Sequence, residues 1–502
     1  MPTPITLAST QLQSRLFRLP RELRDLIYYH YLYNEAGLTY NFYTNKLHVN
    51  LSLMYTCRAA ALELRGLALR LNKVVFCTTY PNATRATSGI FHKAFDKLHV
   101  LKFDLLNLQA PHLMTEAIKK EVSLKYPQFS PVLATLGTGY CRSTLGEPAS
   151  TFRDFVHFTL NLLYDRKYNP TLGGKRSERR RRSLRKINPE PWSTPNEGRL
   201  PRGQEGEFGY STRCYRRDLA VTLDRELQQL ADVTVTPDRV ERVKYCLSAA
   251  ACAIRFLRSL RAETREHVRN VELIENRESI AFPECHGRGF IPFCREQPKL
   301  RVHRRVSLWR NVFPVTTGLS YSIGGQRLKD DRLVSSYVSS AVAKWMAEAS
   351  ALPSLGMPEG SFKLTLECDS APEETTEVFN VVQRDAAWQT ALDLSYARHL
   401  LPQPDWRIRR LRSAYLYEAF PKLLEQVTNG DHPFIHCDFH PGTVCDPEDI
   451  IRERRGDSSQ QWHQAWFNYT PGEFQTPANM PPWHKLRAGY IVWDVYGGAR
   501  YH

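Results

Sequence analysis

Residues 15–28, RLFRLPRELRDLIY, place an apolar lead-in before a proline, which is followed by an amphipathic run. Pro20 suits the first turn of a helix, where a backbone N–H is not needed for an intrahelical bond. Leu23, Leu26 and Ile27 recur at helical spacing behind it. The stretch therefore predicts a short helix with one apolar face that starts at the proline.

Periodicity and turn residues predict a series of elements after this helix. They are a hairpin over 38–49, a helix over 51–71 that ends at Asn72, strands over 73–77, 98–105, 268–274, 362–368 and 432–438, helices over 152–164, 236–260, 331–349, 373–397 and 406–427, and a loop over 279–294. Beyond residue 446, tryptophans at 462, 466, 483 and 493 predict a tail anchored by aromatic packing. A strand–helix rhythm repeats, and helix outweighs strand.

The predicted fold class is α+β, with a small helical N-terminal region and a mixed, helix-rich body. The chain of 502 residues is long enough for several domains. The stretch over 169–217 has no apolar period and is rich in Pro, Gly, Arg, Ser and Glu, which predicts a disordered basic linker. The expected divisions are a helical region over 15–80, a mixed α/β segment over 81–168, this linker, and a helix-rich α+β region over 218–502.

The positive charge is concentrated in one place. Eight basic residues and one acidic residue lie between residues 175 and 186, and they supply nearly half of the net charge of +16. Such a run is typical of a nuclear-import signal, of a weak phosphate binder, or of a solvated linker. No aromatic residue interrupts it, so the stacking used by single-strand binders is missing and nucleic acid is not the preferred partner.

Cysteine usage and the termini predict an intracellular protein. Eleven cysteines without a repeating spacing favour free thiols in a reducing compartment. The first fifteen residues lack the basic flank and apolar core of a secretory signal. The longest apolar run, 245–254, is too short to cross a bilayer. We therefore expect a nuclear or cytoplasmic protein with no membrane partner.

The N-terminal motif resembles a known family. Residues 19–23, LPREL, followed by Ile-Tyr at 27–28, resemble the opening of F-box domains. Two Glu-x-Arg triplets, at 22–24 and 63–65, are similar to those of the F-box-like domain found in uncharacterised fungal proteins. The resemblance covers about residues 15–80.

This resemblance implies a docking role. F-box domains bind a Skp-type adaptor within a cullin-based ubiquitin ligase, and the remainder of the chain selects a substrate protein. The partner would then bind through residues 15–33, with the apolar face of an amphipathic helix laid into a groove. The residues implied to form this face are Leu16, Leu19, Pro20, Leu23 and Ile27.

An alternative leaves this face inside the protein. The same leucines could pack on the apolar seam of the second predicted helix, because apolar stripes usually form core. In that arrangement Arg24 could pair with Glu63, or Glu22 with Arg65, between the two helices. Arg24 also stands where F-box helices usually have an apolar residue.

Two further groups of residues suggest chemistry. His436, Cys437, His440 and Cys445 are the densest set of potential metal ligands, but they lack the paired arms of structural zinc sites, and adjacent ligands in a strand point to opposite faces. Cys285 and His286 are adjacent, which rarely suits a nucleophile and its base. We therefore expect no metal, no cofactor and no catalytic residue.

Residues 436–443 also resemble the catalytic loop of aminoglycoside-phosphotransferase-like kinases. Asp438 would then orient the acceptor hydroxyl, but Thr443 stands where the metal-binding Asn belongs. The sequence as a whole predicts a non-catalytic protein-interaction protein, a substrate-selecting F-box-like subunit of a ubiquitin ligase. The alternatives are a phosphotransferase-like enzyme centred on Asp438 and a nucleic-acid-associated nuclear protein.

Overall fold

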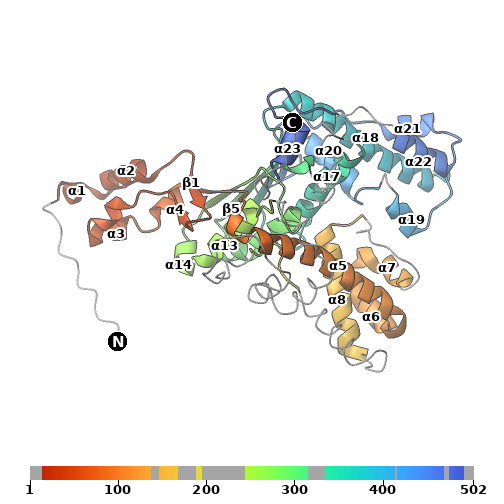
Figure 1. Ribbon diagram of the computed structural model, residues 1–502, viewed down its shortest axis with the longest axis horizontal. Helices are drawn as coiled ribbons and strands as arrows, with labels where there is room; N and C mark the ends of the chain where they lie inside the picture. The colour runs from red at the N-terminus through yellow and green to blue at the C-terminus, as the bar shows by residue number, and fades with distance from the viewer. Residues whose placement is uncertain are drawn as a thin grey trace, which may run out of the picture.

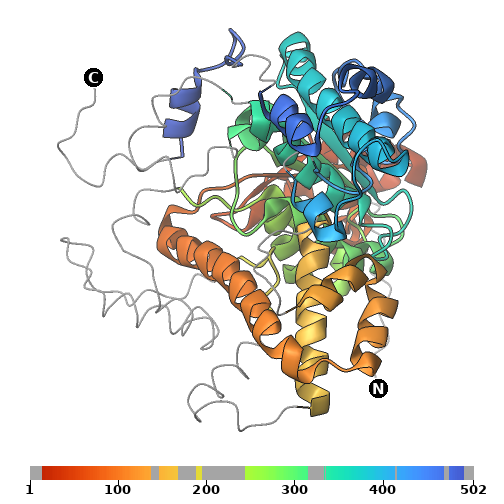
Figure 2. The ribbon, with the colours of Figure 1, turned by 90° about the vertical axis from the view of Figure 1, so that its right-hand side faces the viewer.

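The protein is a mixed helix-and-sheet molecule, seen here in a computed structural model (Figures 1 and 2). The structure describes residues 14–136, 146–167, 188–194, 244–314, 333, 335–412, 415–468 and 474–490. Most of the predicted linker over 169–217 and the predicted helix start at Thr236 lie outside these residues. None of the helices in this described part is long and apolar enough to span a membrane.

A seven-stranded sheet forms the centre, and its strand order is β2-β1-β3-β4-β5-β6-β7. The strands are β1 (Leu38–Asn41), β2 (Lys46–Leu47), β3 (Lys73–Cys77), β4 (Asn270–Glu275), β5 (Arg301–Ser307), β6 (Phe362–Glu367) and β7 (Ile435–Cys437). Only the β1–β2 hairpin is antiparallel, and every other neighbouring pair is parallel. β3 lies beside β1, and from β4 onward each strand lies beside the strand that precedes it in the chain. The sheet therefore joins strands of the predicted 15–80 region to strands of the predicted 218–502 region.

Helices make up most of the remainder. They are α1 (Arg15–Arg18), α2 (Arg21–Leu32), η1 (Ser52–Tyr55), α3 (Arg58–Glu63), α4 (Leu67–Leu71), η2 (Asn82–Thr84), α5 (Arg85–Leu113), α6 (Glu116–Lys125), η3 (Pro127–Phe129), α7 (Ser130–Thr135), α8 (Ala149–Lys167), α13 (Ala249–Ser259), α14 (Ala262–Arg265), η5 (Pro283–Phe290), α15 (Ile291–Glu296), η6 (Leu308–Val312), α17 (Ser335–Ser350), α18 (Pro372–Ala397), α19 (Trp406–Leu411), α20 (Phe420–Thr428), α21 (Pro447–Glu453), α22 (Ser459–Asn468) and α23 (Trp483–Ala488).

The main core lies on one face of the sheet. Strand register places Val74, Val271 and Val302 in one row across β3, β4 and β5, and all three are buried. This row belongs to the same apolar cluster as residues of α13, α17, α18 and α20, such as Ile254 and Val342. Because side chains alternate between the two faces of a strand, the residues between these buried ones lie on the opposite face.

Two smaller cores support the ends of the body. Aromatic side chains of α8, including Phe152 and Phe155, pack with Phe129 and with residues of α5 and α6. Figure 2 shows α5 and α8 running side by side in this lobe. A third cluster joins α18 to α21 and α22 through Trp388 and Trp462.

A buried ion pair links the sheet to the helices. Glu275 at the end of β4 and Arg304 on β5 are both fully buried, with Nη2 and Oε1 2.7 Å apart. The Glu275 carboxylate also accepts the backbone N–H groups of Ala249 and Ala250 at the start of α13. Arg304 donates to the carbonyl of Pro283 in η5 at 2.7 Å. One polar group therefore connects two strands and two helices.

Many predicted elements are confirmed. The first helix, the hairpin with its turn at Asn45, and the strands at 73–77, 268–274, 362–368 and 432–438 are present within one to three residues of their expected ends. The helices predicted over 152–164, 331–349 and 373–397 correspond to α8, α17 and α18.

The single helix predicted over 51–71 is wrong. The segment forms η1, α3 and α4. Cys57 caps the start of α3, and Gly66, with a left-handed φ of 69°, separates α3 from α4. A Cβ at this glycine would lie 1.9 Å from Cδ2 of His267, so the turn leaves room only for glycine. Asn72 ends α4, as predicted.

Three other predictions also differ from the structure. Residues 98–105 are not a strand but the middle of α5, and the buried Phe91, Phe95 and Leu98 follow one face of that helix. The helix predicted over 406–427 is two short helices, α19 and α20. The loop predicted over 279–294 is helical, as η5 and α15. In each case neighbouring elements decide between patterns that the local sequence leaves ambiguous.

The helix predicted over 236–260 corresponds to α13, which begins at Ala249, and residues 236–243 lie outside the described residues. Ser248 is its N-cap, because its hydroxyl accepts the N–H of Ala251 at 2.9 Å. Residues 244–247 precede the helix, and Leu247 forms an isolated bridge with Thr79. The cap fixes the start of α13 at Ala249, next to Glu275.

Loss of the buried arginine is expected to destabilise the body strongly. Arg304→Met leaves the Glu275 carboxylate buried without its main partner, so we expect the free energy of unfolding to fall by about 3 to 5 kcal/mol. Thermal and urea denaturation measure the change. Arg305→Met, at the next position on the opposite face, should cost only about 0 to 1 kcal/mol. Equal stability of the two variants would contradict the role given to Arg304.

The pH dependence of stability tests a half-buried acid, Glu278. Burial, helped by the nearby charge of Glu284, raises the pKa of Glu278 to about 7, while Lys344 opposes this. The folded protein then holds the proton more tightly than the unfolded chain, so stability falls as the pH rises from about 4.5 through 7. Glu278→Gln is expected to add roughly 1 to 3 kcal/mol at pH 8 and almost nothing at pH 4. A gain of the same size at both pH values would show that titration of Glu278 is not its cause.

Candidate functional site

The N-terminal helices form a head that projects from the body. In Figure 1 helices α1, α2 and α3 lie at the opposite end of the molecule from α18, α21 and α22. The head has a core of its own, centred on the buried Tyr28, Leu32, Ala60 and Leu64. This small core holds α2 on α3 and α4.

Helix α2 forms as its sequence predicts. Pro20 precedes the first helical residue with φ of −52°, and Glu22 lies in the first turn, where negative charge favours the helix dipole. The helix ends at Leu32. Its inner face buries Tyr28 completely, and Leu32 is nearly as buried.

The side chains of Arg24, Tyr28 and Glu63 form a hydrogen-bonded group, which we call the clasp, that fixes α2 to the end of α3. Arg24 donates to Glu63 through Nη2 to Oε1 at 2.7 Å and through Nε to Oε2 at 3.1 Å. The Tyr28 hydroxyl donates to the same Oε2 at 2.7 Å. Arg24 also donates to the Leu19 carbonyl. The Arg24–Glu63 pairing proposed from the sequence is thus present. It explains why an arginine stands at a position where an apolar residue was expected.

The contacts within the clasp shift the pKa values of Glu63 and Tyr28. Partial burial alone would raise the pKa of Glu63, but hydrogen bonds from Arg24 and Tyr28 and the charge of Arg21 outweigh it, so its pKa is below the ordinary value. Burial and the hydrogen bond to Glu63 raise the pKa of Tyr28 to about 12. Glu63 is therefore a carboxylate at neutral pH and accepts both donors.

The outer face of α2 is apolar and exposed. Leu23 is 47% exposed, Leu26 56% and Ile27 41%. These three residues, spaced by three and one along the helix, lie on one side of it, and we call them the α2 ridge. Single exposed apolar residues are ordinary, but three together on a helix whose other face is fixed form a patch that suits a partner.

The structure divides the predicted docking residues into two groups. Leu23 and Ile27 belong to the ridge, and Pro20 just before it is exposed. Leu16 and Leu19 are half-buried, and Leu16 packs against the core of the head. The alternative in which Leu19, Leu23 and Ile27 pack on the second predicted helix is wrong for Leu23 and Ile27, because both are exposed and Tyr28 and Leu32 occupy that side instead. Leu19 is half-buried.

Leu26 belongs to the ridge but is not among the docking residues that the resemblance implies. Its position three residues after Leu23 was the available signal, since residues three and four apart share a helix face. Other exposed apolar residues of the head are Tyr29 and Tyr33, whose rings stack with centroids 5.0 Å apart, and Leu62 on α3. The head therefore presents apolar surface beyond the ridge itself.

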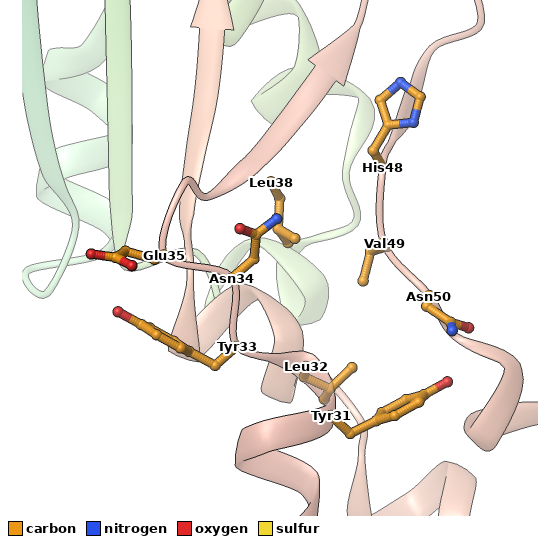
Figure 3. Close-up of a pocket in the computed structure, with 9 residues that line it drawn as sticks. All are labelled: Tyr31, Leu32, Tyr33, Asn34, Glu35, Leu38, His48, Val49 and Asn50. Atoms are coloured by element: carbon orange, nitrogen blue, oxygen red, sulfur yellow. The ribbon is translucent and has the colours of Figure 1, made fainter.

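A pocket of about 370 Å³ lies where the head meets the sheet (Figure 3). It is lined by Tyr31, Leu32, Tyr33, Asn34, Glu35, Leu38, His48, Val49 and Asn50. In Figure 3 the carboxylate of Glu35 points away from the ring of His48, so the two do not form an acid–base pair. The Tyr31 hydroxyl accepts the N–H of Leu53 at 3.2 Å. The pocket is thus a hollow at a junction, without a catalytic arrangement.

The candidate metal ligands near the C-terminus do not converge. His436 shares a sheet row with Thr365 and Arg305 on one face of β7, whereas Cys437 shares the row of Leu366 on the covered face. Burial raises the pKa of the Cys437 thiol well above its ordinary value. No group of three or more His, Cys, Asp or Glu side chains that could hold a metal ion occurs among the described residues.

Asp438 lies at the end of β7 and has a structural contact. Its Oδ1 accepts the backbone N–H of Cys368 at 2.8 Å. Thr443, which stands at the position of a metal-binding Asn in the kinase resemblance, donates its backbone N–H to Asn380 at 2.8 Å. These bonds tie the loop after β7 to β6 and α18.

Among the described residues, no hydrogen bond joins the thiol of Cys285 to the imidazole of the adjacent His286. Ser248 donates to Nδ1 of His286, whose Nε2 donates to the Ala281 carbonyl at 2.9 Å. Burial lowers the pKa of His286 to about 3, so the ring stays neutral. The Sγ of Cys285 accepts from Arg153 at 3.2 Å, and burial raises its pKa to about 12. Both residues are built into the core.

Comparison of this chain with protein-family models, with curated proteins and with solved structures finds no match. The candidate site therefore stands on the sequence and the geometry of the head.

The clasp can be tested by removing one hydroxyl. Tyr28→Phe keeps the buried ring but deletes the hydrogen bond to Glu63, so we expect the head to lose about 0.5 to 1.5 kcal/mol of stability. Hydrogen–deuterium exchange of the α2 amides should become several-fold faster, because their local opening free energy falls. Tyr29→Phe, which alters an exposed ring on the same helix, is the control. Unchanged α2 exchange in Tyr28→Phe would contradict the clasp.

Proposed function

We propose that this protein is a protein-interaction subunit that docks onto a Skp-type adaptor through the α2 ridge and presents its body to a second protein. The observation that supports this proposal is the division of α2 into two faces. One face is fixed by the head's core and by the Arg24–Glu63 clasp, and the other exposes Leu23, Leu26 and Ile27.

The ridge has the chemistry of a helix that binds in a groove. Amphipathic helices bind such grooves through apolar residues on one side. Each ridge side chain would gain roughly 1.5 to 3 kcal/mol if it became fully buried from full exposure. Because each is already about half buried, the available gain is smaller, and the surrounding exposed rings of Tyr29 and Tyr33 add to the area a partner can cover.

The rigidity of α2 favours binding. A helix that must fold on contact spends part of its interaction energy on ordering. Here the clasp and the buried Tyr28 hold the helix in place before any partner arrives. The proposed role in a cullin-based ubiquitin ligase rests on the F-box-like motif, and the ridge supplies a surface for it.

The test is capture of a purified Skp-type adaptor by the tagged full-length protein. Leu23→Asp places a charge on the ridge. We expect the affinity of this variant for the adaptor to fall by tenfold or more, because an apolar contact is lost and a charge would have to be buried. Isothermal titration or quantitative pull-down gives the affinity.

Leu124→Asp is the matched control for this measurement. Leu124 lies on α6 in a different lobe and is 86% exposed, so the same change of charge occurs far from the head. Its affinity for the adaptor should equal that of the unaltered protein. Equal capture by Leu23→Asp and Leu124→Asp, or no capture by the unaltered protein, would reject adaptor docking through the ridge.

A further inference from the structure

The second face of the central sheet is built differently from the first. Parallel sheets usually have helices on both faces. Here the described helices that join the main core lie on the face of Val74 and Val302. Most alternate residues of β3 to β6 bear polar or charged side chains, including Lys73, Glu272 and Lys363, and the exceptions are Val75, Cys77 and Ile274. We call this second side the polar face.

A ladder of charges crosses the polar face. Lys73 on β3 pairs with Glu272 on β4 at 2.7 Å, Glu272 pairs with Arg305 on β5 at 3.0 Å, and Arg305 pairs with Glu367 on β6 at 2.5 Å. Each link joins neighbouring strands. The two carboxylates are mostly buried by their partners, whereas Lys73 and Arg305 remain about 40% exposed. The ladder therefore holds its charges in fixed positions and neutralises both acids.

One cation on β6, Lys363, is not a member of the ladder. Lys363 is exposed, and no acidic side chain of the described residues lies within ion-pair distance of it. It shares a row with His303 on β5, and the next row contains Arg305, Thr365 and His436. We call these five residues the β5–β7 patch.

The β5–β7 patch combines two cationic side chains with two imidazoles and a hydroxyl. His303 Nε2 lies 2.8 Å from the Thr365 hydroxyl. Partial burial lowers the pKa of His303 and of His436, and the charge of Lys363 lowers both further. Glu272, which shares the row of His303, opposes this effect on His303, so Lys363 is the cation whose charge acts on both imidazoles.

We infer that the β5–β7 patch binds an acidic segment of a protein partner, with Lys363 as its central cation. A carboxylate over the row of His303 and Lys363 would meet one free ammonium group and nearby imidazoles. Glu367 offers little repulsion because Arg305 neutralises it. Asp438, beyond the end of β7, marks the limit of the favourable region, so the segment is expected over the earlier rows of the strands.

The geometry favours a peptide over a small anion. The polar face is open across several strands, and charge complementarity of this kind directs a partner's orientation and its rate of association. The patch does not require the α2 ridge, since the two belong to different elements. Binding of an acidic partner is thus a second activity, which can be tested independently of adaptor docking.

The probe for the test is a fluorescein-labelled peptide of ten glutamates, titrated with the full-length protein and followed by fluorescence polarisation. Lys363→Glu should weaken binding by about fivefold or more, because it replaces the central attraction by repulsion. Lys363→Gln should give a smaller loss. Circular dichroism and thermal melting should match those of the unaltered protein, since the side chain is exposed.

Lys120→Glu is the matched control, because it changes the net charge equally at an exposed lysine of α6. Its binding should change less than about twofold. Equal losses in Lys363→Glu and Lys120→Glu would overturn the inference, since attraction would then depend on net charge alone. Binding that survives Lys363→Glu but disappears when Arg179 to Arg182 are replaced by serine would also overturn it, because the arginine run would then hold the peptide.

Adaptor capture separates this inference from the proposed function. Lys363→Glu should bind the adaptor normally, and Leu23→Asp should bind the acidic peptide normally. Loss of peptide binding in Leu23→Asp would contradict a patch that acts independently of the head.

Discussion

The pairing of Glu275 with Arg304 is the interaction on which the body of this protein depends. Taking two charges out of water is costly, and the cost is offset only when each charge is fully hydrogen-bonded. Here the carboxylate accepts the arginine and two amides at the start of α13, and the guanidinium reaches the carbonyl of Pro283. The pair thereby fixes the register of β4 against β5 and positions α13 and η5 on the same side.

This buried pair also explains the contrast between the two faces of the sheet. Arg304 and Arg305 are neighbours in sequence, but one is fully buried under Trp345 and the other is partly exposed in the charge ladder. Alternation along the strand sends them to opposite faces. The covered face gains its stability from apolar burial and one satisfied ion pair, whereas the polar face is held by surface ion pairs, which stabilise little and leave charge available to a partner.

Helix α2 of the head also has two different faces. A buried tyrosine and a shared carboxylate fix one side of α2, and the apolar residues of the other side remain exposed. The head and the polar face thus offer two surfaces of different chemistry, one apolar and one charged. Different interactions maintain each of these surfaces, apolar packing and the clasp in the head and the charge ladder on the polar face.

The sequence by itself determined the local structure wherever a pattern had one interpretation. Pro20 and the spacing behind it defined α2, the turn at Asn45 defined the hairpin, and alternating apolar residues defined β4 and β6. The charges of Arg24 and Glu63 allowed their pairing to be anticipated. The helix, the hairpin and the two strands depend on residues close together in the chain, whereas Arg24 and Glu63 are 39 positions apart and were matched by opposite charge.

Only the tertiary structure decided the rest. Leu23 is exposed because Tyr28 and Leu32 fill the space against α3 and α4. The turn at Gly66 packs against His267, about two hundred residues away in the chain. The β5–β7 patch unites strands that are separated by long segments. A periodic sequence shows that a face is apolar or charged, but it does not show what covers that face, because burial results from contacts between distant parts of the chain.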